Sequence, residues 1–156
     1  MVSGGQSGVD RAALDFAIAH GIPYGGWCPR GGWAEDRPDP PGLLAAYPGL
    51  RETPSDDPAE RTRWNVRDSD ATLLILAGGE PTSGSPGVEA TERAAIEMGR
   101  ALLRVGPGEG ADAHVRVERL LGELPAGCTL NVAGPRQSEA PDAYALGLRM
   151  LELLFG

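Results

Sequence analysis

The sequence predicts an α/β protein: a Rossmann-like, doubly wound parallel sheet of about five strands with helices on both faces. Short apolar runs alternate along the chain with segments whose apolar residues recur at helical spacing, and this alternation is typical of βα units. The run Ala71–Ala77 (ATLLILA) is apolar without interruption, as in a parallel strand buried on both faces. No repeat or linker divides the 156 residues, so we expect one domain over 1–156.

The first half of the chain begins with Met1–Ser3, which can form only the stub of a strand. A helix follows, and it ends at residues 20–23 (HGIP), where glycine and proline give a stop signal. Its apolar stripe consists of Val9, Ala12, Ala13, Phe16 and Ala17. A short strand is predicted over Pro23–Trp27. Residues 28–56 have no periodicity beyond a turn of helix at Leu43–Tyr47, which is typical of a binding loop or lid.

The second half predicts helices and strands in alternation. A capping box at residues 57–60, with proline at the first helical position, begins a helix that runs to about Arg67. The strand Ala71–Ala77 and a glycine-rich stretch at 78–87 come next. The remaining elements are a helix from about Val88 to Gly99, a strand at Leu102–Val105, a helix at His114–Leu121, a strand at Thr129–Val132 and a helix over about Pro141–Leu154.

The charged residues exclude several functions. All 14 basic residues are arginine, so neither a Schiff-base enzyme nor a P-loop NTPase is possible, because both need a lysine. The 22 acidic residues give a net charge of −8, which argues against nucleic-acid and membrane-surface partners.

The residues that could bind metal or act as nucleophiles are isolated. Cys28 and Cys128 lie far apart, as do His20 and His114, so we predict no metal site and no catalytic residue. A signal peptide and an apolar run of about 20 residues are both missing, and we expect a cytoplasmic protein.

The loops after the predicted strands all contain glycine, and ligands of open parallel sheets bind at this carboxyl edge. The loop Ser3–Gly8 leads into the first helix, whose backbone N–H groups and dipole form an anion site without lysine. The alternative is a tight turn in which Asp10 complements the helix N-terminus.

Several arginines could bind an anion at the same edge. Arg136 follows a buried strand and is a candidate clamp for phosphate or carboxylate, or else a solvated loop residue. Arg11 and Arg30 are further candidates, although Arg11 can also pair with Asp15 one helical turn away.

The helix that begins near residue 57 runs antiparallel to the sheet, so Arg61 and Thr62 are expected near the carboxyl edge. Trp33 lies in a loop and could stack on a flat ligand. Trp27 and Trp64 are expected to pack in a core.

Five separated segments resemble the molybdenum carrier proteins, and the resemblance runs from Met1 to Leu154. These proteins carry molybdenum cofactor, and they belong to the SLOG superfamily together with LOG-type nucleotide phosphoribohydrolases and DNA-processing proteins. The segments are SGGQSGVDRAALD (3–15), GIPYGGWCPRG (21–31) with Ala34–Asp36, LRETPS (50–55), ERTRWNVRDSDATLLIL (60–76) and LNVAGPRQSEAP (130–141).

The resemblance implies a non-catalytic carrier that holds molybdopterin by its phosphate and shields it from oxidation. The flat pterin would lie under residues 28–56. The implied cofactor-binding residues are Gly4, Gly5, Gln6, Ser7 and Gly8 with Arg11 nearby, Gly87 and Thr91 of a second glycine loop, and Gly134, Pro135 and Arg136 of a third, with Arg30 as the further candidate. We expect a homo-oligomer, a dimer or tetramer, whose partners are molybdoenzymes or cofactor-synthesis proteins.

Two features depart from the family pattern. The family usually has several more residues before S-G-G-Q, and its common G-G-T is replaced here by residues 85–88 (SPGV). The P-G-G core of the phosphoribohydrolases is also missing, although Glu89 and Glu92 lie nearby. A LOG-like nucleoside 5'-monophosphate phosphoribohydrolase therefore remains the alternative, and the sequence favours a binding protein over an enzyme.

Overall fold

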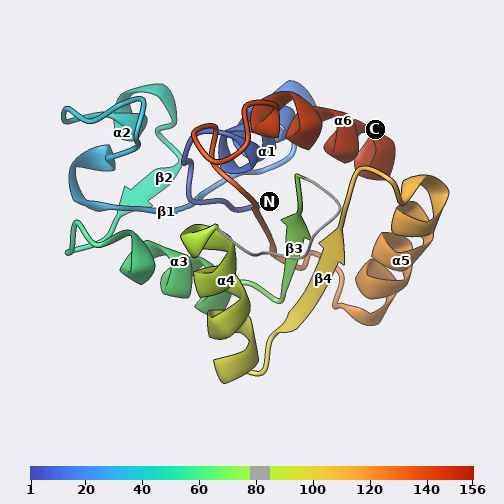
Figure 1. Ribbon diagram of the computed structural model, residues 1–156. Helices are drawn as coiled ribbons and strands as arrows, with labels where there is room; N and C mark the ends of the chain where they lie inside the picture. Colours follow the sequence, from blue (N-terminus) through green and yellow to red (C-terminus); the bar gives the residue numbers. More distant parts are fainter. Residues whose placement is uncertain (78–84) are drawn as a thin grey trace.

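Figure 1 shows the computed structural model of the chain, which describes residues 1–77 and 85–156. A parallel sheet lies between two layers of helices, as predicted. The strands are β1 (Gly26–Cys28), β2 (Leu50–Glu52), β3 (Ala71–Ile75), β4 (Ala101–Val105) and β5 (Leu130–Ala133). The helices are α1 (Val9–Ala19), the short η1 (Arg30–Gly32) and α2 (Leu43–Ala46), α3 (Pro58–Arg67), α4 (Pro86–Glu97), α5 (Gly110–Glu123) and α6 (Ala143–Phe155).

The stub Met1–Ser3 joins two groups of parallel strands. One group has the order β4-β3-β5, and the other pairs β1 with β2. Val2 donates from its backbone N to the Leu130 carbonyl at 2.8 Å, while Ser3 N donates to the Gly25 carbonyl at 3.1 Å. The sheet therefore reads β4-β3-β5-(Met1–Ser3)-β1-β2.

The helices divide between the two faces of the sheet. Helices α1, α5 and α6 pack on one face around Phe16, Leu73 and Leu151, whereas α3 and α4 cover the other face (Figure 1). All five residues of β3 are buried, which confirms the prediction from the apolar run.

Two strands differ from the prediction. The strand expected at Pro23–Trp27 lies at Gly26–Cys28, where it pairs with β2. Strand β2 was not predicted at all, because it is a three-residue edge strand whose Arg51 and Glu52 are exposed and leave no apolar pattern. The predicted helical turn near Leu43 is confirmed as α2.

The fifth helix is longer than predicted. Helix α5 begins at Gly110 rather than at His114. The prediction missed the first turn because its glycine hides the helical periodicity. The carboxylate of Glu109, directly before it, accepts a hydrogen bond from Gly106 N at 2.9 Å and holds the preceding turn.

The prediction that Trp27 and Trp64 pack in a core was wrong. Their rings meet edge to face with centroids 4.7 Å apart, and both residues are half-buried. A guanidinium group lies over each ring. Arg51 Cζ is 4.2 Å from the centroid of the Trp27 ring, and Arg67 Cζ is 4.6 Å from the centroid of the Trp64 ring. The two indoles thus form a small cation–π cluster on the surface of β1 and α3.

Candidate functional site

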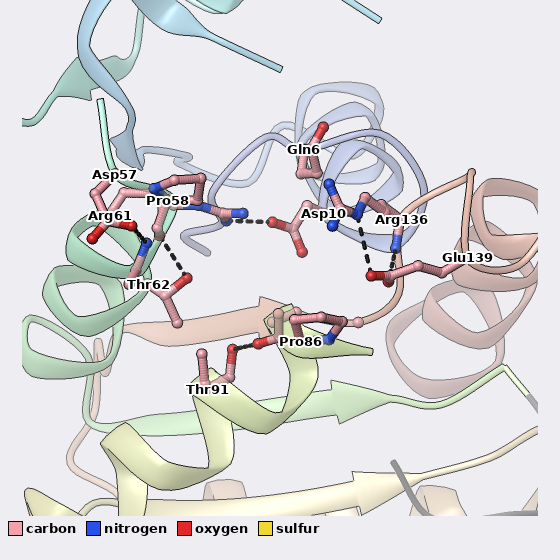
Figure 2. A pocket seen from close by; sticks show the side chains of 15 residues that line it. Gln6, Asp10, Asp57, Pro58, Arg61, Thr62, Pro86, Thr91, Arg136 and Glu139 are labelled. Atoms are coloured by element: carbon pink, nitrogen blue, oxygen red, sulfur yellow. Dashed lines mark hydrogen bonds and ion pairs between the residues drawn. The ribbon is translucent and has the colours of Figure 1, made fainter. Parts of the chain in front are cut away.

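A cavity of about 300 Å³ opens at the carboxyl edge of the sheet, and we call it the edge pocket (Figure 2). This volume is at the lower end of the range for small-molecule sites. The end of β5 and the starts of α1, α3 and α4 surround it. Its lining residues are Gln6, Asp10, Asp57, Pro58, Ala59, Arg61, Thr62, Pro86, Gly87, Ala90, Thr91, Ala133, Gly134, Arg136 and Glu139.

Capping residues fix where α3 and α4 begin, and both helix starts lie at the edge pocket. Asp57 caps α3 by accepting a hydrogen bond from Ala59 N at 2.9 Å, and Pro58 occupies the first helical position. Ser85 caps α4 by accepting from Val88 N at 3.4 Å. Two positive helix ends therefore face the same cavity.

An ion pair between Asp10 and Arg61 lies at the edge pocket. Asp10 is 3% exposed, and its Oδ2 accepts a hydrogen bond from Arg61 NH1 at 2.9 Å. Burial raises the pKa of Asp10 above its ordinary value, while Arg61 and the backbone N–H groups of Gly134 and Gln6 oppose this rise. The Asp10 carboxylate is thus surrounded by the donors that an anionic ligand would need.

The N-terminus of α1 is already occupied by groups of the protein. Val9 N donates to the Pro135 carbonyl at 3.2 Å, and Ser7 N donates to Gln6 Oε1 at 3.0 Å. The carboxylate of Asp10, in the first turn, also lies at this end of the helix. Asp10 therefore complements the helix N-terminus, which was the alternative interpretation of this loop.

Arg136 approaches the edge pocket from the side opposite Arg61, with Asp10 between them (Figure 2). Its Nε donates to Glu139 Oε1 at 3.1 Å, and its NH1 lies 3.8 Å from Glu35 Oε2. Both guanidinium groups of the pocket are thus paired with carboxylates.

Three carboxylates line the edge pocket, against two guanidinium groups. The acidic side chains are those of Asp10, Asp57 and Glu139, and the basic ones are those of Arg61 and Arg136. An anionic ligand would have to compete with these carboxylates rather than enter a purely positive site.

Glu35 ties three loops together behind the pocket. Its carboxylate accepts hydrogen bonds from Ser7 Oγ, from Ser138 Oγ at 2.6 Å and from Ser138 N at 3.1 Å. Partial burial opposes ionisation, but the hydrogen bonds from Ser138 and Ser7 keep the pKa of Glu35 below its ordinary value. Glu35 thereby links the loops that carry Gln6 and Arg136 into the pocket.

The structure brings only some of the predicted site residues together. Those that line the edge pocket are Gln6, Gly87, Thr91, Gly134 and Arg136. Those that lie in adjoining loops without lining it are Gly4, Gly5, Ser7, Gly8 and Pro135.

The other two candidates lie away from the edge pocket. The guanidinium of Arg11 binds both carboxylate oxygens of Asp36 at 2.9 Å. Its alternative partner, Asp15, instead accepts hydrogen bonds from Tyr47 and Tyr144. Arg30 is exposed on the surface, where its NH2 lies 3.6 Å from Asp56.

Residues 28–56 pack against α1 and contribute no side chain to the edge pocket. Leu43 and Leu50 lie with Leu14 of α1 in one apolar cluster, and Trp33 is half-buried outside the cavity. The segment is therefore a flank of α1, and the pocket entrance is formed by other elements.

Some pocket residues were missed from the sequence. Glu139 had a detectable signal, because it lies three residues after Arg136, a spacing that favours pairing. Asp10 looked like a helix-end residue, and only the fold shows that it also holds Arg61. The expected position of Arg61 and Thr62 near the carboxyl edge is confirmed, since both line the pocket.

The two glutamates of the hydrolase alternative lie outside the edge pocket. Glu92 pairs with Arg104 of β4, and Glu89 is exposed on α4. Of the glycine-rich stretch at 78–87, residues 78–84 lie outside the described residues, and Ser85–Gly87 lie within them.

Residues 1–77 and 85–156 contain neither a cluster of metal ligands nor a membrane-crossing helix. In that part of the chain, no group of three or more His, Cys, Asp or Glu side chains is arranged to hold a metal ion. None of its helices combines the length and the apolar character needed to cross a membrane.

Comparison with known proteins gave two matches. The sequence profile of the circularly permutated YpsA SLOG family matches residues 1–155. The crystal structure of a protein named "Putative molybdenum carrier protein", from Syntrophus aciditrophicus SB, superposes with a TM-score of 0.83 at 36% identity. That match covers 99% of this chain and 93% of the other. No curated protein matches the sequence.

Proposed function

The chain belongs to the circularly permutated YpsA SLOG family, and on that premise we propose that it is a carrier that holds molybdenum cofactor, a phosphorylated pterin, in the edge pocket. The observation that carries the proposal is this cavity of about 300 Å³ at the carboxyl edge, entered by two arginines. The name of the similar Syntrophus protein supports the molybdenum-containing ligand.

The residues of the edge pocket fit a ligand with an anionic end and a flat ring. Arg61 and Arg136 offer planar donors suited to phosphate oxygens. Small side chains, those of Ala59, Ala90 and Ala133, leave room for a ring between the starts of α3 and α4. The proposal therefore places the pterin between these helices rather than under residues 28–56.

The glycine loop Ser3–Gly8 takes part mainly through Gln6, whose side chain lines the pocket. We propose that the other residues of this loop hold the shape of the site. The protein would act in the cytoplasm as a dimer or tetramer and pass the cofactor to molybdoenzymes or receive it from cofactor-synthesis proteins. Light scattering measures the oligomeric state.

Co-purification tests the carrier function. The protein is produced in a host that makes molybdopterin and in a matched host that does not, and the pterin is released and measured by fluorescence after oxidation. We expect pterin only from the first host. Absence of pterin from that protein, together with no uptake of added cofactor, would contradict the proposal.

Arg136 should contribute directly to ligand affinity. Replacing Arg136 by Ala should weaken binding of the phosphorylated ligand by about 1–3 kcal/mol, because charge-assisted hydrogen bonds are lost. Arg30→Ala is the matched control: this exposed arginine lies outside the pocket, and we expect a change within about 0.5 kcal/mol. Equal affinities for both variants would remove Arg136 from the site.

The phosphoribohydrolase alternative predicts that free base is released from a nucleoside 5'-monophosphate. Its predicted acids, Glu89 and Glu92, do not line the edge pocket. Lack of activity over a panel of nucleotides would exclude it, whereas activity that disappears on Glu→Gln replacement at either position would establish it over the carrier function.

A further inference from the structure

Gly4 makes room for a guanidinium group. A Cβ atom added at Gly4 would lie 1.7 Å from Arg61 NH1, 2.7 Å from Arg61 Cζ and 2.9 Å from Asp10 Oδ2. Any side chain at this position would displace the cation. The start of the glycine loop thus serves as a seat for Arg61, which is a different role from offering free N–H groups to a phosphate.

Arg61 uses only part of its hydrogen-bonding capacity. Its side chain is 11% exposed, NH1 binds Asp10, and Nε is buried without a hydrogen-bond partner among the described residues. A guanidinium group carries five N–H donors, and a buried donor without a partner is unfavourable. Because Arg61 lines the edge pocket, an acceptor group on a bound ligand would meet its guanidinium there.

The carboxylate of Asp10 already acts as such an acceptor for Arg61. This carboxylate is itself an oxyanion, and it faces Arg61 and the backbone N–H groups of Gln6 and Gly134. An entering oxyanion meets the same donors and is repelled by the Asp10 charge.

We propose that the anionic group of the ligand binds at Arg61, on the seat formed by Gly4, in competition with the carboxylate of Asp10. The ligand class is a tetrahedral oxyanion, either free or at the end of a phosphomonoester. This inference rests on the proposed binding function of the edge pocket, but it does not depend on the identity of the pterin.

The competition couples anion binding to protonation of the Asp10 carboxylate. The charged groups that line the pocket with Asp10 are Arg61 of α3, Asp57 at the start of α3 and, across the pocket, Arg136 and Glu139 from the loop after β5. Burial already raises the pKa of Asp10, and an anion at Arg61 raises it further by repulsion. Asp10 therefore takes up a proton when the anion binds, and binding is tighter at lower pH.

Sulfate is a suitable probe, because it stays a dianion throughout the working pH range. Sulfate affinity is measured by NMR titration of the labelled full chain and of Asp10→Asn, which keeps the shape but removes the charge. We expect Asp10→Asn to bind sulfate on the order of tenfold more tightly at neutral pH. We expect Gly4→Ala, which displaces Arg61, to bind it on the order of tenfold more weakly.

Asp57→Asn is the matched control for charge alone. Asp57 also lines the edge pocket but makes no bond to Arg61, and asparagine caps a helix as well as aspartate does. Its effect on sulfate affinity should be clearly smaller than that of Asp10→Asn. Equal effects of the two variants, or unchanged affinity in Asp10→Asn, would overturn the competition.

The pH dependence gives a second readout. Wild-type affinity for sulfate should fall as pH rises, by up to about tenfold per unit for one linked proton, and Asp10→Asn should lack this dependence. If that variant does not fold, the carboxyl carbon of Asp10 in the wild type reports the same event. Its NMR shift should move toward the protonated value when sulfate is added, and an unmoved signal contradicts the proposal.

A comparison of one further probe with sulfate separates the sources of the anion. Guanosine 5'-monophosphate carries a phosphomonoester and a bicyclic ring, whereas sulfate is a free oxyanion. Tighter binding of the nucleotide favours an esterified ligand, and equal binding favours a free oxyanion. Sulfate binding in a protein that never carries pterin would refute only the carrier function, while pterin binding unaffected by Asp10→Asn and Gly4→Ala would refute only the Arg61 site.

Discussion

Replacing Arg61 by Gln should lower the free energy of unfolding by about 3–5 kcal/mol at neutral pH. The variant leaves Asp10, which is 3% exposed, without the cation that faces it at 2.9 Å. An uncompensated buried charge is far costlier than the loss of a surface ion pair. Urea denaturation followed by circular dichroism measures the change.

The loss should depend on pH in a defined direction. The folded state binds the Asp10 proton more tightly than the unfolded state, because burial raises this pKa. The contribution of Asp10 to the free energy of unfolding is therefore fully present at pH values below its unfolded pKa of about 3.9. It is lost as the pH rises through the pKa of Asp10 in the folded state. Without Arg61 the folded pKa rises further, so the deficit of Arg61→Gln should shrink near pH 4 (about the unfolded pKa).

Two controls accompany this prediction. Arg63→Gln, on the same helix, removes an exposed pair with Glu97 and should cost no more than about 1 kcal/mol. The double variant Asp10→Asn with Arg61→Gln should regain much of the lost stability. Equal losses for Arg61→Gln and Arg63→Gln would show that the buried pair does not stabilise the fold.

Replacing Gly8 by Ala should destabilise the protein by about 2–4 kcal/mol. Gly8 has φ 83° and ψ −135°, a conformation that residues with a side chain rarely adopt. A Cβ there would lie 2.4 Å from the Pro135 carbonyl oxygen and 2.9 Å from Arg136 Cα. Both contacts are with backbone, so the loop after β5 would have to move, and the pocket would change with it.

Gly99→Ala separates the cost of the positive φ from the cost of the close backbone contacts. Gly99 also has a positive φ, 61°, but an added Cβ would meet nothing within 4 Å. Its cost should be about 1 kcal/mol, from the left-handed backbone alone. If thermal and urea unfolding give the same loss for both variants, the close approach of Gly8 to the loop after β5 has no energetic weight.

The fold could be predicted because its strong elements carry local signals. The stripe of Phe16 and its neighbours, the apolar strand at Ala71 and the cap at Asp57 each depend on residues close in sequence. Strand β2 could not be found in this way, since its Arg51 and Glu52 are exposed and its stability comes from pairing with β1.

The site was harder to predict, because charge pairing across the chain decides which arginines face the edge pocket. Arg11 and Arg136 have the same chemistry in the sequence, yet Asp36 engages the first outside the edge pocket. Likewise, nothing near Gly4 in the sequence indicates that Arg61, 57 positions later, will rest against it. Long-range contacts of this kind are visible only in the folded chain.

The strand order explains why the pocket lies where it does. The strands can be renumbered so that β3, β4 and β5 become strands 1, 2 and 3, and Met1–Ser3, β1 and β2 become strands 4, 5 and 6. The spatial order β4-β3-β5-(Met1–Ser3)-β1-β2 then reads 2-1-3-4-5-6. This is the flavodoxin-like order, in which connections leave neighbouring strands toward opposite faces at a topological switch point. Here α4 follows β3 on one face and α6 follows β5 on the other, which opens a crevice beyond the two strands. Circular permutation changes the order of the strands along the chain, but their spatial order keeps the switch point, and the edge pocket remains with it.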